Sequence, residues 1–128
     1  MSIVDRKDQA EIFDLNLSEN SVVASGSHLG KCTIKNKTTP CKIIVAENKQ
    51  SLKIMLIGET IKLKNTFNLN DATKHSLEGN AKEVVSWSKK KNKEDYIKLK
   101  VSKNNTILDG QLELRDRRGF KSKVYFTR

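Results

Sequence analysis

The chain has one proline, two cysteines and two histidines in 128 residues, and each scarcity excludes something. No stretch rich in proline, glycine or serine separates two halves, so we expect one domain. Cys32 and Cys41 form no CxxC pair, and with His28 and His75 they make no metal-binding pattern. A disulfide between the cysteines stays open, but two free thiols are the expected state, as in cytosolic or nuclear proteins. We predict no metal and no cofactor.

Long hydrophobic runs are missing as well. The first residues, "MSIVDRKDQAEIF", are charged where a secretory signal would be apolar, and no later run could span a bilayer. We therefore expect an intracellular protein, nuclear in a eukaryote and cytoplasmic otherwise, with no membrane partner.

Patterns typical of catalysis are also absent. There is no GxSxG and no glycine-rich phosphate loop. Asp109 and Asp116 flank an expected strand, but neither has an obvious carboxylate partner for acid–base work. His28 and His75 would have to meet in space for ribonuclease-like chemistry, and two such histidines are more typical of solvated loops. The sequence predicts a protein that is not an enzyme.

What the chain does contain is alternation of period two, as in "KCTIK", "ETIKLKN", "YIKLKV" and "GQLELRD". Apolar side chains then share one face of each strand. "CKIIVAE" is a continuous apolar run, typical of a central strand, and "NKQSLKIML" at 48–56 is the best helical candidate. The sequence predicts an all-β fold with six or more strands and one short helix, in a small closed or partly open β-barrel or a sandwich.

The end of the chain predicts a hairpin. "RDRRGF" is typical of a turn, with Gly119 where a positive φ is needed, so residues 111–127 form a C-terminal hairpin that is either part of the barrel or appended to it. Residues 11–128 are expected to make the barrel domain, after a loosely ordered segment at 1–10. Phe13 and Phe120 are expected in the core. The other predicted core residues are Ile43, Val45, Ile61, Leu63, Leu99, Leu112, Leu114, Val124 and Phe126.

Charge points to a partner. The net charge is +10, but residues 1–20 carry −3 and residues 65–128 carry +7. Such asymmetry favours nucleic acid, an anionic membrane surface or an acidic protein. The outward strand positions hold no acid outside the "QLELR" strand, whereas a merely solvated sheet usually mixes signs. That these lysines decorate unrelated faces of a barrel stays open. The outward lysines and tyrosines are Lys31, Lys35, Lys62, Lys64, Tyr96, Lys98, Lys100, Lys121, Lys123 and Tyr125.

Residues 38–86 carry a resemblance. "CKIIV" at 41–45 is similar to a central strand, 48–55 to a short helix, "IGETIKL" at 57–63 to a step into the next strand, and "LEG" at 77–79 to the start of a closing strand. In this order they resemble an oligonucleotide-binding (OB) barrel of the replication-protein-A kind. The segment "LDGQLELRDRRGFKSKVYF" itself resembles the first strands of another such barrel. The resemblance implies single strands carried in a basic groove while aromatic rings stack on bases.

We therefore expect a non-enzymatic module that binds single-stranded DNA or RNA within a larger nucleoprotein complex. Two alternatives stay open. One is a protein-interaction barrel, an adaptor or inhibitor that docks an acidic partner. The other is a pleckstrin-like domain for anionic lipid, which we rank last because that fold closes with a helix and "KVYFTR" indicates a strand. The predicted nucleic-acid contacts are Lys62, Lys64, Phe67, Trp87, Tyr96, Lys98, Lys100, Arg117, Arg118, Lys121, Lys123 and Tyr125.

Overall fold

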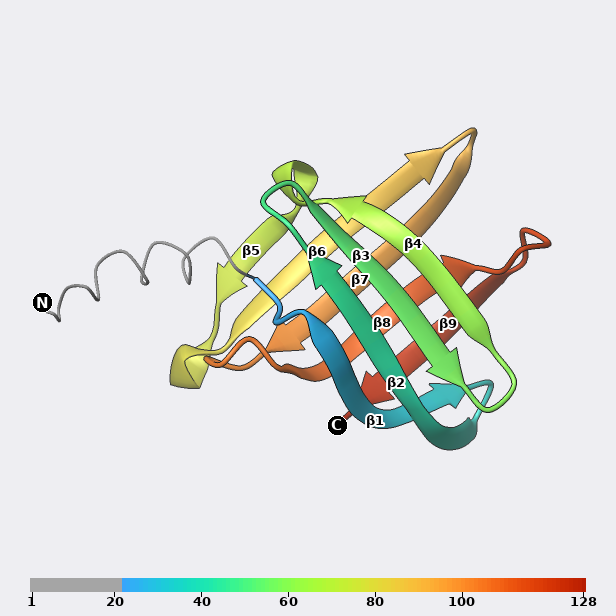
Figure 1. Cartoon of the computed structure of the whole chain (residues 1–128), viewed down its shortest axis with the longest axis horizontal. Coiled ribbons are helices and arrows are strands. Elements are labelled where there is room, and N and C mark those ends of the chain that lie inside the picture. The colour runs from blue at the N-terminus through green and yellow to red at the C-terminus, as the bar shows by residue number, and fades with distance from the viewer. Residues whose placement is uncertain (1–21) are drawn as a thin grey trace, which may run out of the picture.

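Nine β-strands make up most of residues 22–128, the part of the chain described by the structure, a computed structural model (Figure 1). In chain order they are β1 (Gly26–Ile34), β2 (Lys37–Glu47), β3 (Ser51–Gly58), β4 (Lys62–Asn68), β5 (Thr73–Ser76), β6 (Lys82–Lys90), β7 (Lys93–Val101), β8 (Ile107–Arg115) and β9 (Lys121–Thr127). Two 3-10 turns, η1 (Leu69–Asp71) and η2 (Glu78–Asn80), flank β5. These residues contain no α-helix.

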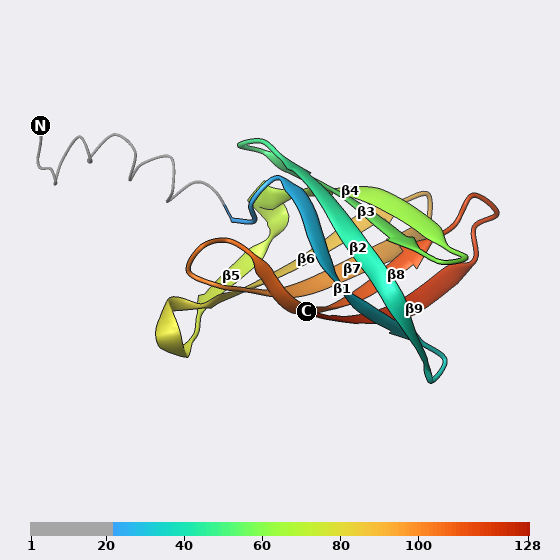
Figure 2. The ribbon, with the colours of Figure 1, turned by 60° about the horizontal axis from the view of Figure 1, so that its bottom comes forward.

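The strands form one antiparallel sheet in the order β4-β3-β2-β1-β9-β8-β7-β6-β5. The sheet curls through 258° into an open half-barrel, and β1 pairs with β9 in its middle (Figure 2). The predicted all-β, partly open fold is confirmed. An OB barrel has five strands in a Greek-key order, whereas this sheet joins two meanders, β1 to β4 and β5 to β9, through the pairing of β1 with β9. The likeness therefore extends only to a curled antiparallel sheet.

The prediction of a helix at 48–56 is wrong, because most of this segment belongs to β3. Leu52, Ile54 and Leu56 are buried and alternate with more exposed residues, which is the period of a strand. Asn48 Oδ1 accepts the backbone N–H groups of Gln50 and Ser51, both at 2.8 Å, and this begins a turn into β3. Apolar side chains stand on both faces of the strand, so the periodicity was ambiguous.

The core lies inside the curl. Eight predicted core residues are buried, and Ile61 is partly buried against them. Phe120 is instead 64% exposed, so its predicted place in the core is wrong. It stands just before β9, at the end that β1 does not reach, since β1 pairs with β9 only at residues 125–127. Phe13 and the segment 1–10 lie outside the described residues. The eight are Ile43, Val45, Leu63, Leu99, Leu112, Leu114, Val124 and Phe126.

The predicted C-terminal hairpin is confirmed as β8 and β9, and Gly119 in its turn has φ +89°. It is an integral part of the sheet, because β9 pairs with β8 on one side and with β1 on the other.

Cys32 and Cys41 form a disulfide, so the expectation of two free thiols is wrong. Cys32 lies opposite Thr39, and Gly30 lies opposite Cys41, so the cysteines are diagonal neighbours on adjacent antiparallel strands. Their Cα atoms are 5.8 Å apart, within the range that a disulfide needs. The separation of nine residues along the chain did not reveal this, because it depends on where the turn between β1 and β2 falls.

Candidate nucleic-acid interface

Seven of the predicted contact residues gather on the outer surface of four neighbouring strands. We call it the β6–β9 face. Its strand register places Tyr96 between Trp87 and Glu113, and Lys98 opposite Gln111, which is itself opposite Tyr125. One face of the sheet therefore collects side chains that lie far apart along the chain. The seven are Trp87, Tyr96, Lys98, Lys100, Lys121, Lys123 and Tyr125.

Aromatic rings are exposed on this face. The Trp87 and Tyr96 rings lie with their centroids 5.1 Å apart and their planes tilted by 50°. Trp87 is 47% exposed and Tyr125 is 50% exposed, so neither ring is committed to the core. A nucleic-acid base offers such rings a π-face on which to stack.

Charge on the β6–β9 face is mixed, although the sequence predicts outward lysines without acids on every strand except "QLELR". Strand β8 lies between β7 and β9, so its outward acidic side chains stand among the lysines of these two strands. Asp109 is opposite Lys100, and Glu113 is opposite Lys123. The strand-by-strand reasoning could not place these acids, because it did not know which strands are neighbours.

Two lysines of the face also form ion pairs. Lys98 Nζ lies 3.9 Å from Glu83 Oε2, and Lys121 Nζ lies 3.7 Å from Glu113 Oε1. Both pairs are partly exposed, so each contributes little to stability, but each reduces the field that an incoming phosphate would meet.

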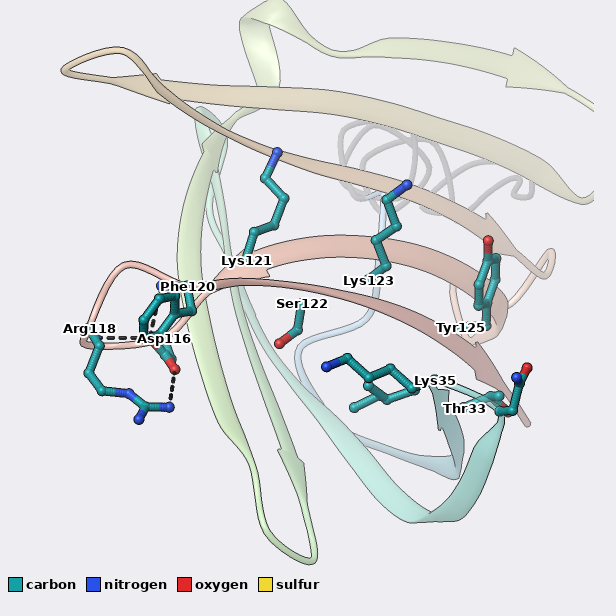
Figure 3. A pocket seen from close by; sticks show the side chains of 11 residues that line it. Thr33, Lys35, Asp116, Arg118, Phe120, Lys121, Ser122, Lys123 and Tyr125 are labelled. Atoms are coloured by element: carbon teal, nitrogen blue, oxygen red, sulfur yellow. Dashed lines mark hydrogen bonds and ion pairs between the residues drawn. The ribbon is translucent and has the colours of Figure 1, made fainter.

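A cleft opens beside this face, where β1 leaves β9. β1 pairs with β9 only from Lys31 to Thr33 and then turns into β2, so residues 121–124 of β9 have no partner strand on that side. The cleft has a volume of about 910 Å³ (Figure 3). Its lining residues are Thr33, Ile34, Lys35, Asn36, Asp116, Arg118, Phe120, Lys121, Ser122, Lys123 and Tyr125.

Figure 3 shows how the side chains of the cleft are arranged. Phe120 and Tyr125 stand at opposite ends of it. Lys121 and Lys123 point to the same side of β9 as Tyr125, whereas Ser122 points to the other side. The lining contains four cationic side chains and one carboxylate, Asp116. The cleft therefore combines exposed rings with an excess of positive charge.

The single acid of the cleft is held by its own turn. Asp116 Oδ1 accepts the backbone N–H groups of Arg118 (2.9 Å) and Phe120 (3.1 Å), and Oδ2 accepts from the Arg118 guanidinium at 3.1 Å. Desolvation tends to raise the pKa of Asp116, but these hydrogen bonds outweigh it and hold that pKa below its ordinary value. The Arg118 guanidinium also lies 5.1 Å from the centre of the Phe120 ring. The carboxylate thus orders the turn that presents Phe120.

A series of polar contacts between side chains in the interior supports the same turn. Arg115 donates from a guanidinium nitrogen to the carbonyl of Gly119 (3.0 Å), and its Nε lies 3.6 Å from Asp95 Oδ1. Asp95 Oδ2 in turn accepts a hydrogen bond of 2.6 Å from the side chain of Asn65 on β4. The open side of the half-barrel is therefore tied, through a buried carboxylate, to the turn beside the cleft.

Four predicted contacts lie elsewhere. Phe67 is fully buried, so its prediction as a stacking ring is wrong: on β4 it shares the inward parity of Leu63. Lys62 and Lys64 are on the outer surface of β4, which packs by its inner side against β6 and β8 and so turns these lysines away from the cleft. Arg117 is exposed in the β8–β9 turn but does not line the cleft.

Sequence reasoning missed Phe120 and Lys35 as site residues. Phe120 has the parity of the buried Val124 and Phe126, and only the early departure of β1 leaves it uncovered. Lys35 was recognised as a cation, but its place in the same cleft as Lys123 depends on the β1–β9 pairing. No sequence signal could have revealed that pairing.

His28 has a structural role. Its Nδ1 accepts the backbone N–H of Ile107 (3.2 Å), so its Nε2 carries the proton and donates to the carbonyl of Ala24 (2.7 Å). Within residues 22–128, His, Cys, Asp and Glu side chains do not gather in threes as a metal site would require. The same residues include no helix that could cross a bilayer. Comparison of the chain with known protein families, with curated proteins and with solved structures finds no match.

Proposed function

We propose that the protein is a non-enzymatic module that binds single-stranded DNA or RNA through the cleft beside β9 and the adjoining β6–β9 face. One observation carries the proposal. Phe120 and Tyr125 stand exposed at the two ends of a cleft whose lining cations outnumber its single, turn-bound carboxylate. Base stacking on such rings contributes roughly 1–3 kcal/mol per base, and contacts between lysine and phosphate add a salt-dependent term.

The bound single-stranded nucleic acid would pass from the cleft onto the β6–β9 face. Tyr125 lines both the cleft and the next hollow along the face, which also contains Lys98 and Lys100. The Trp87–Tyr96 pair lies beyond it and provides a further stacking surface. Because acids accompany the lysines on this face, we expect the cleft to contribute most of the affinity. The OB resemblance supports this binding mode by analogy only, because the strand order differs from that of an OB barrel.

Fluorescence anisotropy with a labelled single-stranded oligonucleotide tests the proposal. Tyr125→Ala and Phe120→Ala should each weaken binding by roughly 1–3 kcal/mol without changing its salt dependence. Replacing Lys121 and Lys123 together by Gln should reduce the slope of log K against log salt by about 1.4, since each contact with a single strand contributes about 0.7.

The matched control replaces Lys62 and Lys64 by Gln. It removes the same charge from the opposite side of the molecule and should bind the oligonucleotide like the parent, apart from a small uniform loss. Parent-like binding by both ring variants and by the Lys121/Lys123 variant would refute the proposal.

A second candidate function rests on a different observation, the missing partner strand along residues 121–124 of β9. An extended peptide can add to such an edge through backbone hydrogen bonds, and Lys121 and Lys123 would favour an acidic one. A peptide rich in Glu should then compete with the oligonucleotide for the cleft. N-methylation of its alternate backbone nitrogens should abolish that competition if the peptide binds as a strand, but leave it unchanged if only charge matters.

The intracellular location also stays a prediction. Its cysteine argument is lost, because a disulfide is typical of oxidising compartments. Free-thiol titration of the protein isolated from its native cells, with alkylation before lysis, would decide which compartment the chain experiences.

A further inference from the structure

A second basic surface lies on the outer side of β2, β3 and β4, and we call it the β2–β4 face. Lys42 is opposite Ile57, which is opposite Lys62; Ile44 is opposite Met55, which is opposite Lys64. Leu29 on β1 lies opposite Lys42 and extends the first of these rows. The first row therefore alternates lysine with aliphatic side chains across four strands, and the second places two apolar side chains beside a lysine. Its members are Leu29, Lys42, Ile44, Lys53, Met55, Ile57, Lys62 and Lys64.

The charge on this face has one sign. No outward position of β2, β3 or β4 is acidic, and none of its four lysines forms an ion pair with a described carboxylate. Glu47, at the end of β2, has the inward parity and accepts the backbone N–H groups of Val22 and Val23. Glu59 lies in the turn between β3 and β4. The β2–β4 face is thus more uniformly basic than the β6–β9 face.

Aliphatic side chains lie among these lysines. Leu29 is 70% exposed, and Ile44, Met55 and Ile57 are each only partly buried. In Figures 1 and 2 no other described strand or turn covers the outer side of β2 to β4. Lysine stems can cover such aliphatic groups in water and release them when the ammonium groups move to a surface of opposite charge.

The chemistry of the face distinguishes between anionic partners. It has no aromatic ring, so the bases of a single strand would find nothing on which to stack. Its cations are all lysines, which are depleted in protein–protein interfaces, whereas arginine and aromatic residues are enriched there. Lysines around exposed aliphatic groups match an anionic lipid surface, where the ammonium groups meet headgroups and the aliphatic groups reach the acyl boundary.

We propose that the β2–β4 face binds peripherally to anionic lipid membranes. The lysines of β4 lie on the opposite side of the half-barrel from the β6–β9 face, because β4 packs by its inner side against β6 and β8. Membrane binding would therefore leave the β6–β9 face open to solvent. This inference is independent of the proposed nucleic-acid binding.

Co-sedimentation with lipid vesicles tests it. The protein should bind vesicles of phosphatidylcholine and phosphatidylserine, should not bind vesicles of phosphatidylcholine alone, and should be released by salt. The double variant K62Q/K64Q should weaken the partition by roughly 30-fold, because each lysine near such a surface raises the binding constant by a factor of about 5. Leu29→Ser should weaken the partition at low salt as well, because it removes an aliphatic contact while leaving the charge of the face unchanged.

The matched control is K98Q/K100Q, which removes two lysines from the β6–β9 face. It should partition like the parent, and K62Q/K64Q should still bind the oligonucleotide. The inference is overturned if the parent ignores phosphatidylserine, or if both double variants lose vesicle binding equally. It is also overturned if K62Q/K64Q keeps its vesicle binding but loses the binding of an oligonucleotide or of an acidic protein. Loss of oligonucleotide binding in the cleft variants alone would bear only on the proposed function.

Discussion

Asp95→Ala should destabilise the half-barrel and loosen the turn beside the cleft. The Asp95 side chain is 6% exposed; it accepts the Asn65 hydrogen bond of 2.6 Å and lies 3.6 Å from Arg115 Nε. Its removal leaves the partly buried Asn65 amide without this acceptor, which costs about 1–3 kcal/mol. Arg115 is 26% exposed and keeps its bond to Gly119, so the lost ion pair adds only about 1 kcal/mol.

The expected loss in the free energy of unfolding is therefore about 2–4 kcal/mol. Urea denaturation followed by the fluorescence of Trp87, the single tryptophan, and by circular dichroism measures it. Asp95→Asn keeps an acceptor for Asn65 and should lose only about 1 kcal/mol. Asp109→Ala is the matched control: this carboxylate is exposed on β8, and its removal should change stability by less than about 0.5 kcal/mol.

A double-mutant cycle with Asn65→Ala separates the contact from general damage. The two losses should be clearly less than additive, since either substitution breaks the same hydrogen bond. If Asp95→Ala cost no more than Asp109→Ala, or if its cost simply added to that of Asn65→Ala, this series of polar contacts would not hold the open side of the sheet.

Three further predictions follow from the fold. Gly30→Ala should cost about 1–3 kcal/mol in urea unfolding, since the new Cβ would lie 2.7 Å from the Phe126 ring where β1 meets β9; an unchanged midpoint would contradict this. Reduction of the Cys32–Cys41 disulfide should cost about 2.5 kcal/mol for its short loop, and a variant with both cysteines replaced by alanine should be indifferent to reductant. Folding lowers the pKa of Asp116, so the ionised carboxylate stabilises the turn. This stabilisation is fully present above the ordinary carboxyl pKa of about 4 and is lost as pH falls through the lower pKa of the folded state. The protection factor of the Phe120 amide, which is the exchange rate corrected for its intrinsic pH dependence, should report this loss, and Asp116→Asn should make that factor independent of pH.

Alternation along the chain was enough to predict strands and most of the core. Leu112, Leu114 and Val124 are buried as their parity predicts, and Tyr125 is exposed as its parity predicts. The inward or outward position of a residue could not reveal which strands are neighbours in the sheet. That Glu113 would stand opposite Lys123 depends on the β8–β9 register, and that Phe120 would be left uncovered depends on where β1 leaves β9. The segment at 48–56 failed for a different reason, because an apolar residue on both faces suits a helix as well as a strand.

The pairing of β1 with β9 has a consequence for how the protein folds during synthesis. Of the eight pairs of neighbouring strands, seven are joined by short connections, and each of these pairs can form as soon as both of its strands have left the ribosome. The eighth contact joins Lys31–Thr33 to residues 125–127, so the two arms of the sheet wait, each with an unpaired edge, until β9 emerges. Closing so long a loop is entropically slow, and in that interval the edges of β1 and β8 are open to strands of other chains. We expect the final β-strand to set both the rate of folding and the period during which the nascent chain is prone to aggregate.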